Sequence, residues 1–193
     1  MLKDPILHPR FTYGDYRQWM GDERWELIDG EAYLMSPAPK RRHQRASMGL
    51  SAQIANALEG GSCQVYAAPF DVRLPDGDEA DDDVATVVQP DVVVICDPAK
   101  LDDAGCRGAP DWVVEILSPS TTARDRIDKR DLYQRHGVDE YWVLDPETAE
   151  LTAFGRSPGS ATFDRIRSGP AREVRGPELL PDLTLDWDRI LEV

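Results

Sequence analysis

Two almost wholly apolar segments each carry a single carboxylate, and this feature most constrains how the chain can fold. Residues 89–95 hold Asp91 directly after a proline, and residues 112–117 hold Glu115. Short apolar runs of this kind predict buried strands. A carboxylate in such a strand costs several kcal/mol unless a partner compensates for its burial. Two of them on successive strands therefore predict a shared ligand, and a divalent cation suits carboxylate oxygens.

Length, charge and hydropathy narrow the class of protein. The 193 residues are enough for one domain, which we expect to span residues 1–193. A net charge of −14 argues against a protein that coats nucleic acid non-specifically, although it leaves room for an enzyme with a small basic patch. We find neither a run of roughly 18 apolar residues nor an apolar signal core. We therefore expect a cytoplasmic protein with no membrane partner.

The three cysteines, Cys63, Cys96 and Cys106, are scattered along the chain. They are too few for a disulfide framework, and none belongs to a C-x-x-C zinc pair. We expect reduced thiols in or near the core.

The pattern of apolar residues, turn residues and caps predicts the order of the elements. An Asp-Gly pair marks the turn of the first hairpin, and six carboxylates fall in the first long loop. The predicted elements are a helix at 12–20, a hairpin at 24–35, a helix at 43–59, a strand at 63–74, a loop at 75–88, a strand at 89–95, a loop at 97–110, a strand at 112–117, a helix ending at 136, and strands at 139–145, 150–155 and 162–168.

Without the added hairpins this order reads helix, three strands, helix, strand. It predicts an α/β protein, or more narrowly an α+β mixed sheet flanked by helices, with an αβββαβ core. We expect the core at about residues 43–145. An N-terminal helix and hairpin would occupy residues 11–36, and C-terminal strands with a β-hairpin and a tail would occupy residues 150–193.

The second long helix directs one basic residue towards the sheet. At about 100° per residue, Asp125, Lys129, Leu132 and Tyr133 share one helical face. Leu132 and Tyr133 should pack on the sheet, so Lys129 is expected to point inward near the strand of Glu115. An ammonium group there can orient or deprotonate a water and can offset charge on a phosphate. The alternative is an exposed Asp125–Lys129 pair worth about 0.3 kcal/mol.

Several short motifs follow one another along residues 11–155. They are Glu26-Leu-Ile-Asp-Gly-Glu31, Ser36-Pro37, His43, Pro90-Asp91-Val-Val-Val, Val114-Glu115-Ile-Leu-Ser-Pro-Ser120, Asp125-x-x-x-Lys129-x-x-x-Tyr133, Gly137-Val-Asp-Glu-Tyr-Trp142 and Asp145-Pro146. In this order they resemble the Uma-type family of bacterial restriction-endonuclease-like proteins, within the PD-(D/E)XK nuclease superfamily. The superfamily pattern places a lysine two residues after the glutamate, where this chain has Leu117. The resemblance implies that Lys129 takes over that role.

The resemblance implies a restriction-endonuclease-like fold and an endonuclease that hydrolyses phosphodiester bonds of DNA. Asp91 and Glu115 would hold Mg²⁺ or Mn²⁺ with the help of the backbone carbonyl of Ile116, and Lys129 would position the attacking water. A nuclease that cuts both strands often works as a homodimer, so we expect one here.

The resemblance also implies supporting residues around this site. Glu26 or Glu31 in the hairpin would add a ligand or a hydrogen bond to a ligand, and we favour Glu31 because it lies just past the turn. His43 would contact the substrate or a ligand. The alternative for His43 is an ordinary surface or capping histidine.

Basic residues gather at two places that would suit contacts to the phosphate backbone. The candidates are Lys40, Arg41, Arg42 and Arg45 at the start of the first long helix, and Arg124 and Arg126 beside Lys129. The alternative for the first group is a solvated helix entry.

Two further interpretations of the function stay open. Asp91 can be a residue that caps backbone groups at a strand start, and the chain can be a catalytically inactive nuclease-fold accessory or interaction module. The absence of a lysine at position 117 and the acidic net charge favour that module. A hydrolase of sugars or other small molecules would keep the two carboxylates but would not need Lys129.

Overall fold

The computed structural model describes residues 10–35, 39–118 and 122–191, with the backbone alone described for residues 122–128. The helices of this part of the chain are α1 (Tyr13–Tyr16), α2 (Arg41–Ala57), α3 (Thr122–His136) and α4 (Trp187–Leu191). The strands are β1 (Trp25–Ile28), β2 (Glu31–Leu34), β3 (Gln64–Ala67), β4 (Val72–Arg73), β5 (Val87–Val88), β6 (Val92–Ile95), β7 (Leu101–Asp102), β8 (Gly105–Arg107), β9 (Trp112–Ile116), β10 (Glu140–Asp145), β11 (Glu150–Gly155) and β12 (Arg165–Pro170). None of the described helices is long and apolar enough to cross a membrane.

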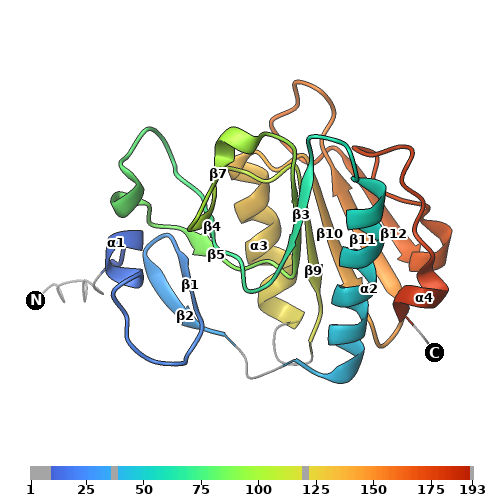
Figure 1. Cartoon of the computed structure of the whole chain (residues 1–193), viewed down its shortest axis with the longest axis horizontal. Coiled ribbons are helices and arrows are strands. Elements are labelled where there is room, and N and C mark those ends of the chain that lie inside the picture. The colour runs from blue at the N-terminus through green and yellow to red at the C-terminus, as the bar shows by residue number, and fades with distance from the viewer. Residues whose placement is uncertain (1–9, 36–38, 119–121, 192–193) are drawn as a thin grey trace, which may run out of the picture.

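A central mixed sheet carries the predicted core. Its described strands lie in the order β12-β11-β10-β9-β6-β3, and β9 and β10 are parallel whereas the other neighbours are antiparallel. Along the chain the core elements follow as α2, β3, β6, β9, α3 and β10, which is the expected αβββαβ order (Figure 1). The predicted mixed α+β fold is therefore confirmed, including the hairpin that β11 and β12 add at the C-terminal side.

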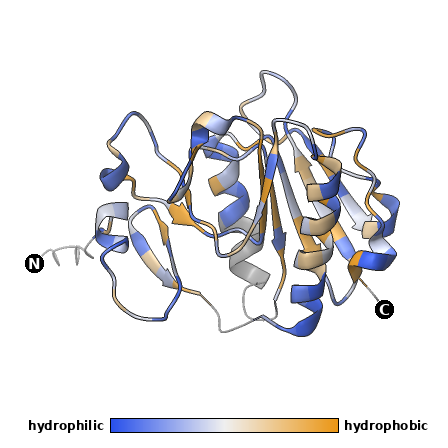
Figure 2. Cartoon of the chain, viewed as in Figure 1, coloured by the Kyte–Doolittle hydropathy of each residue, from blue (hydrophilic) through white to orange (hydrophobic). Residues whose placement is uncertain are grey.

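The two faces of the central sheet are covered by different helices, and most of its strands are strongly hydrophobic (Figure 2). Residues of α2, α4 and the C-terminal segment pack with Trp112, Val114 and Ile116 on one face. Residues of α3 pack with Val113 and Leu117 on the other. Because side chains alternate along a strand, Glu115 shares the face that α3 covers.

A second described sheet, in the order β2-β1-β5-β4-β8-β7, packs beside α3. The hairpin expected at residues 24–35 is confirmed as β1 and β2, and its turn residues Asp29 and Gly30 have positive φ angles of 52° and 80°. A two-residue hairpin turn needs such angles, which explains the Asp-Gly sequence.

Three of the six described strands of this second sheet are missing from the sequence-based expectations. Strand β5 lies in the segment predicted as a loop at 75–88, and β7 and β8 lie in the segment predicted as a loop at 97–110. The strand predicted at 63–74 is divided into β3 and β4, and the helix predicted at 12–20 is limited to Tyr13–Tyr16. Strands of two or three residues are too short to produce a periodic pattern, so their pairing partners alone define them.

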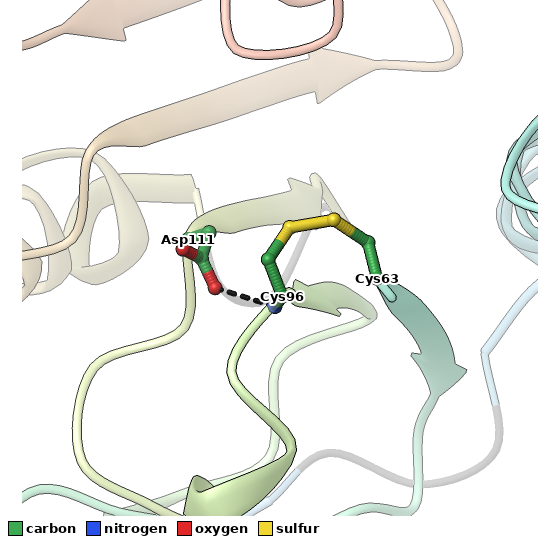
Figure 3. The surroundings of a disulfide bond; sticks show 3 residues. All are labelled: Cys63, Cys96 and Asp111. Atoms are coloured by element: carbon green, nitrogen blue, oxygen red, sulfur yellow. Dashed lines mark hydrogen bonds between the residues drawn. A yellow bond between two sulfur atoms is a disulfide. The ribbon is translucent and has the colours of Figure 1, made fainter. Parts of the chain in front are cut away.

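The expectation of three reduced thiols is wrong for two of the cysteines. Cys63 and Cys96 form a disulfide, and Figure 3 shows it at the start of β3, next to Asp111. Gln64 and Ile95 are opposite each other in the antiparallel pair of β3 and β6, so Cys63 and Cys96 continue that register by one step. The pairing of the strands brings the two residues together across 33 positions of sequence, which their spacing does not reveal.

Cys106 provides a direct test of this arrangement, because it is buried and free, and burial raises the pKa of its thiol to about 11. We expect a thiol reagent at neutral pH to label no cysteine in the native protein. It should label one cysteine in denaturant and three after reduction in denaturant. Mass spectrometry of the labelled protein measures each stage. Three labelled cysteines in denaturant without reductant would contradict the disulfide.

Candidate active site

Asp91 and Glu115 face each other at one end of the antiparallel pair formed by β6 and β9. Val92 is opposite Val114, so Asp91 and Glu115 are the next opposing positions. The Oδ2 atom of Asp91 accepts a hydrogen bond of 2.8 Å from the backbone N–H of Ile116. The same oxygen lies 3.2 Å from Nε2 of His43, which belongs to the first turn of α2. The two predicted carboxylates therefore lie at the same end of the β6–β9 pair, and His43 contacts Asp91 there.

Lys129 lies directly beside Glu115 and is only 4% exposed. Its Nζ donates to Oε1 of Glu115 at 2.9 Å and to Oε1 of Glu26 at 2.9 Å. The inward direction expected for Lys129 thus matches its place on α3. The alternative pairing with Asp125 involves a side chain outside the described residues.

Tyr133 follows Lys129 by one helical turn and supports the same carboxylate. Its hydroxyl donates to Oε1 of Glu115 at 2.8 Å. Burial, reinforced by the negative charges of Glu115 and Glu26, raises the pKa of Tyr133 well above its usual value. The phenol therefore stays protonated at neutral pH and acts as a donor. The sequence predicts that Tyr133 packs on the sheet, and its spacing of four residues from Lys129 puts both side chains on one helical face.

The N-terminal hairpin supplies Glu26 to this cluster. Glu26 is buried on β1, and its Oε1 accepts from Lys129 and, at 2.9 Å, from the backbone N–H of Gln89. Gln89 was not a sequence candidate, because nothing but the pairing of β1 with β5 brings it here.

Glu31, which the sequence favoured over Glu26, lies elsewhere. It is exposed, and it accepts a hydrogen bond of 2.8 Å from the hydroxyl of Tyr33. With Asp29 and Arg135 it lines a shallow pocket between the hairpin turn and α3. Arg135 is six residues, or about 9 Å of helix, beyond Lys129. The turn is thus too far along α3 for Glu31 to reach Lys129, whereas Glu26 lies further back along β1.

The donor set of this cluster fits a hard divalent cation. Glu26 and Glu115 share the ammonium of Lys129, and Asp91 occupies the strand position opposite Glu115. Within the described residues no three side chains of His, Cys, Asp or Glu converge as a ready-made metal site. Mg²⁺ does not require one, because it keeps several waters and is held by one or two carboxylates. The pair of Asp91 and Glu115 meets that requirement.

The predicted basic residues are only partly assembled around the site. Lys40, Arg41 and Arg42 are exposed at the start of α2, within one turn of His43, and Arg42 pairs with Glu147 at 3.5 Å. Arg45 is half-buried on the same helix. The side chains of the two candidates on α3, Arg124 and Arg126, lie outside the described residues.

Replacing Lys129 with Met should strongly destabilise the fold, because Glu26 and Glu115 would lose their shared cation. Breaking a buried ion pair costs about 3–5 kcal/mol. The matched control is Lys100→Met, which removes one hydrogen bond of 2.9 Å to the carbonyl of Ala109 and should cost about 1 kcal/mol. Urea unfolding at pH 7 measures both changes. Equal costs for the two variants would contradict the buried cluster.

Comparison with known proteins identifies the fold and the family of this chain. A crystal structure described as "a putative nuclease belonging to DUF820", from Anabaena variabilis ATCC 29413, superposes with a TM-score of 0.72 at 16% identity and covers 94% of this chain and 98% of its own, which shows a shared fold. An uncharacterized protein of Synechocystis sp. (strain ATCC 27184 / PCC 6803 / Kazusa) is 29% identical over 152 residues, which cover 77% of this chain and 76% of that one. The model of the Uma2 family, described as "Putative restriction endonuclease", matches residues 13–188. The chain therefore belongs to the Uma2 family.

Proposed function

We propose that this protein is a metal-dependent endonuclease that hydrolyses phosphodiester bonds of DNA. The observation that carries the proposal is the arrangement of Asp91, Glu115 and Lys129. The ammonium of Lys129 lies 2.9 Å from Oε1 of Glu115, and Asp91 occupies the position opposite Glu115 on the paired strand. Membership of the Uma2 family supports the same reaction class.

Mg²⁺ or Mn²⁺ is the proposed cofactor, and Asp91, Glu115 and the backbone carbonyl of Ile116 would hold it. A bound cation of this kind lowers the pKa of a coordinated water and offsets the charge that develops on the phosphate.

Hydrogen bonds from neighbouring residues orient these proposed ligands. Tyr133 fixes the orientation of Glu115 through its hydroxyl, and the backbone N–H of Ile116 fixes that of Asp91. Lys129, held by Glu26, would orient the attacking water and add positive charge beside the phosphate. His43 lies on the other side of Asp91, where it can contact the substrate.

Further parts of the proposal concern partners. DNA would lie near the start of α2, where Lys40, Arg41 and Arg42 can contact backbone phosphates. A homodimer would allow both strands of a duplex to be cut. The cytoplasm, where DNA is accessible, is the proposed compartment.

A second candidate is a catalytically inactive accessory module with a nuclease fold. Lys129 is held between two glutamates, Leu117 occupies the usual lysine position, and the chain carries a net charge of −14. These features allow the cluster to act as a structural element alone. The two candidates differ in whether metal binding and cleavage depend on the carboxylates.

The test uses Asp91→Asn with Asp111→Asn as a matched control. Asp111 stands at the start of β9 as Asp91 stands at the start of β6, and its Oδ2 accepts a hydrogen bond of 2.7 Å from the backbone N–H of Cys96. Both substitutions weaken one strand cap, but only Asp91 lies at the site. We expect Asp91→Asn and Glu115→Gln to lower cleavage of labelled DNA in Mg²⁺ or Mn²⁺ by at least about 100-fold, as the loss of a catalytic group does. Asp111→Asn should cleave like the wild type.

Calorimetric titration with Mn²⁺ completes this experiment. The wild type and Asp111→Asn should bind the ion, and Asp91→Asn should not. Equal loss of cleavage in Asp91→Asn and Asp111→Asn would assign Asp91 a capping role only. A wild type that binds no metal and cleaves no DNA would favour the accessory module.

A further inference from the structure

Arg24 is held next to the candidate active site by a neutral partner. Its Nε and Nη2 atoms donate to Oε1 of Gln89 at 2.9 and 2.6 Å. The backbone N–H of Met35 donates to the carbonyl of Arg24 at 2.8 Å, which extends the β1–β2 ladder by one residue. Since side chains alternate along a strand, Arg24 and Glu26 lie on the same face of the hairpin.

The amide of Gln89 can be oriented in only one way. Its Nε2 lies 2.8 Å from Oδ1 of Asp71 and 3.1 Å from the hydroxyl of Tyr16. A carboxylate accepts hydrogen bonds and the guanidinium only donates them. The NH₂ group of Gln89 therefore faces Asp71, and its oxygen faces Arg24.

This amide separates Arg24 from Asp71. No described carboxylate lies within ion-pair distance of Arg24, whereas the buried Arg73 has direct partners in Asp81 and Asp102. Gln89 thus fixes the direction of the Arg24 guanidinium without a direct ion pair, although burial raises the pKa of Asp71 and the charge of Arg24 still acts across the amide to lower it. A half-buried, oriented arginine with no direct carboxylate partner among the described residues is suited to bind an anion, and its fork matches phosphate oxygens.

Gln89 also connects Arg24 to the site itself. Its backbone N–H donates to Oε1 of Glu26, the same oxygen that accepts from Lys129. Gln89 precedes Asp91 by two residues, so the residue that holds Arg24 adjoins the strand that carries the candidate metal ligand.

We propose that Arg24 binds a backbone phosphate of the DNA strand at the candidate active site and that Gln89 positions its guanidinium for this contact. The inference rests on the proposed endonuclease function, because it names the substrate contact of that site. A purely structural role, in which Arg24 only ties the hairpin to the segment before β6, would leave the salt dependence of DNA binding unchanged.

The test measures binding of a labelled DNA duplex by fluorescence anisotropy between 50 and 200 mM salt, in Ca²⁺ and separately in EDTA. We expect Arg24→Gln to weaken binding roughly fivefold and to reduce the slope of log K against log salt by about 0.9, the value for one lost phosphate contact. Arg24→Lys keeps the charge and should retain most of the slope. The control Arg17→Gln removes an exposed arginine that pairs with Asp82 at 3.2 Å, and it should bind like the wild type.

Thermal unfolding of each variant separates loss of folding from loss of binding. A folded Arg24→Gln with the wild-type slope, or a wild type that binds no duplex in either condition, would overturn the inference. If Arg24→Gln unfolds, the affinity of Arg24→Lys decides: we expect weaker binding at a nearly unchanged slope because lysine lacks the guanidinium fork, and wild-type affinity in this variant would overturn the inference. A reduced slope in Arg24→Gln together with a wild type that never cleaves would refute the endonuclease proposal and leave the phosphate contact standing.

Discussion

The buried ammonium of Lys129 is the interaction on which the rest of the site depends. It joins Glu115 of the central sheet to Glu26 of the second sheet, and it comes from the helix that lies between them. Removing charges from water is expensive, and only close, well-formed contacts offset that cost. Two short ion pairs and the hydroxyl of Tyr133 provide such contacts. The second sheet therefore meets the core at this site as well as through the apolar cluster that packs Val72 and Val88 against Leu132, and the hairpin is part of the site.

At each end of the β6–β9 pair an aspartate caps a backbone N–H, but the surroundings of the two aspartates differ. Asp91 and Asp111 each cap a backbone N–H of the opposite strand, one position beyond the residue that each faces. Asp111 has the Cys63–Cys96 disulfide beside it. Asp91 instead has His43 and the cluster of Glu115 beside it. Capping alone therefore explains Asp111, while Asp91 has two further charged neighbours, His43 and Glu115, at the same strand end.

The sequence predicts those parts of the fold that have a long enough pattern. The apolar runs around Asp91 and Glu115 and the helical spacing of Lys129 and Tyr133 correctly indicate the central sheet and the covering helix. The second sheet is different, because strands such as Val87–Val88 are defined by their partners rather than by any local pattern. The disulfide depends on the same long-range pairing.

The sequence favours Glu31 over Glu26, whereas the structure places Glu26 next to Lys129, and the reason is again a long-range one. Both residues lie on the same face of the hairpin, since Ile28 is opposite Glu31 and Glu26 is opposite Tyr33. Only the direction of α3 across that face decides which glutamate meets Lys129 and which lies near Arg135. That direction is a tertiary property with no trace in either segment alone.

Lys129 and Arg24 are both near the candidate site, but different partners hold them, and this difference suggests different roles. Lys129 is buried and compensated by two carboxylates, so its charge mainly preserves the geometry of Glu26 and Glu115. Arg24 is half-buried and oriented by an amide, so its charge stays available to an anion. In a chain with a net charge of −14, long-range attraction of DNA is weak. Local, oriented positive charge is then the means by which such a site can hold a phosphate.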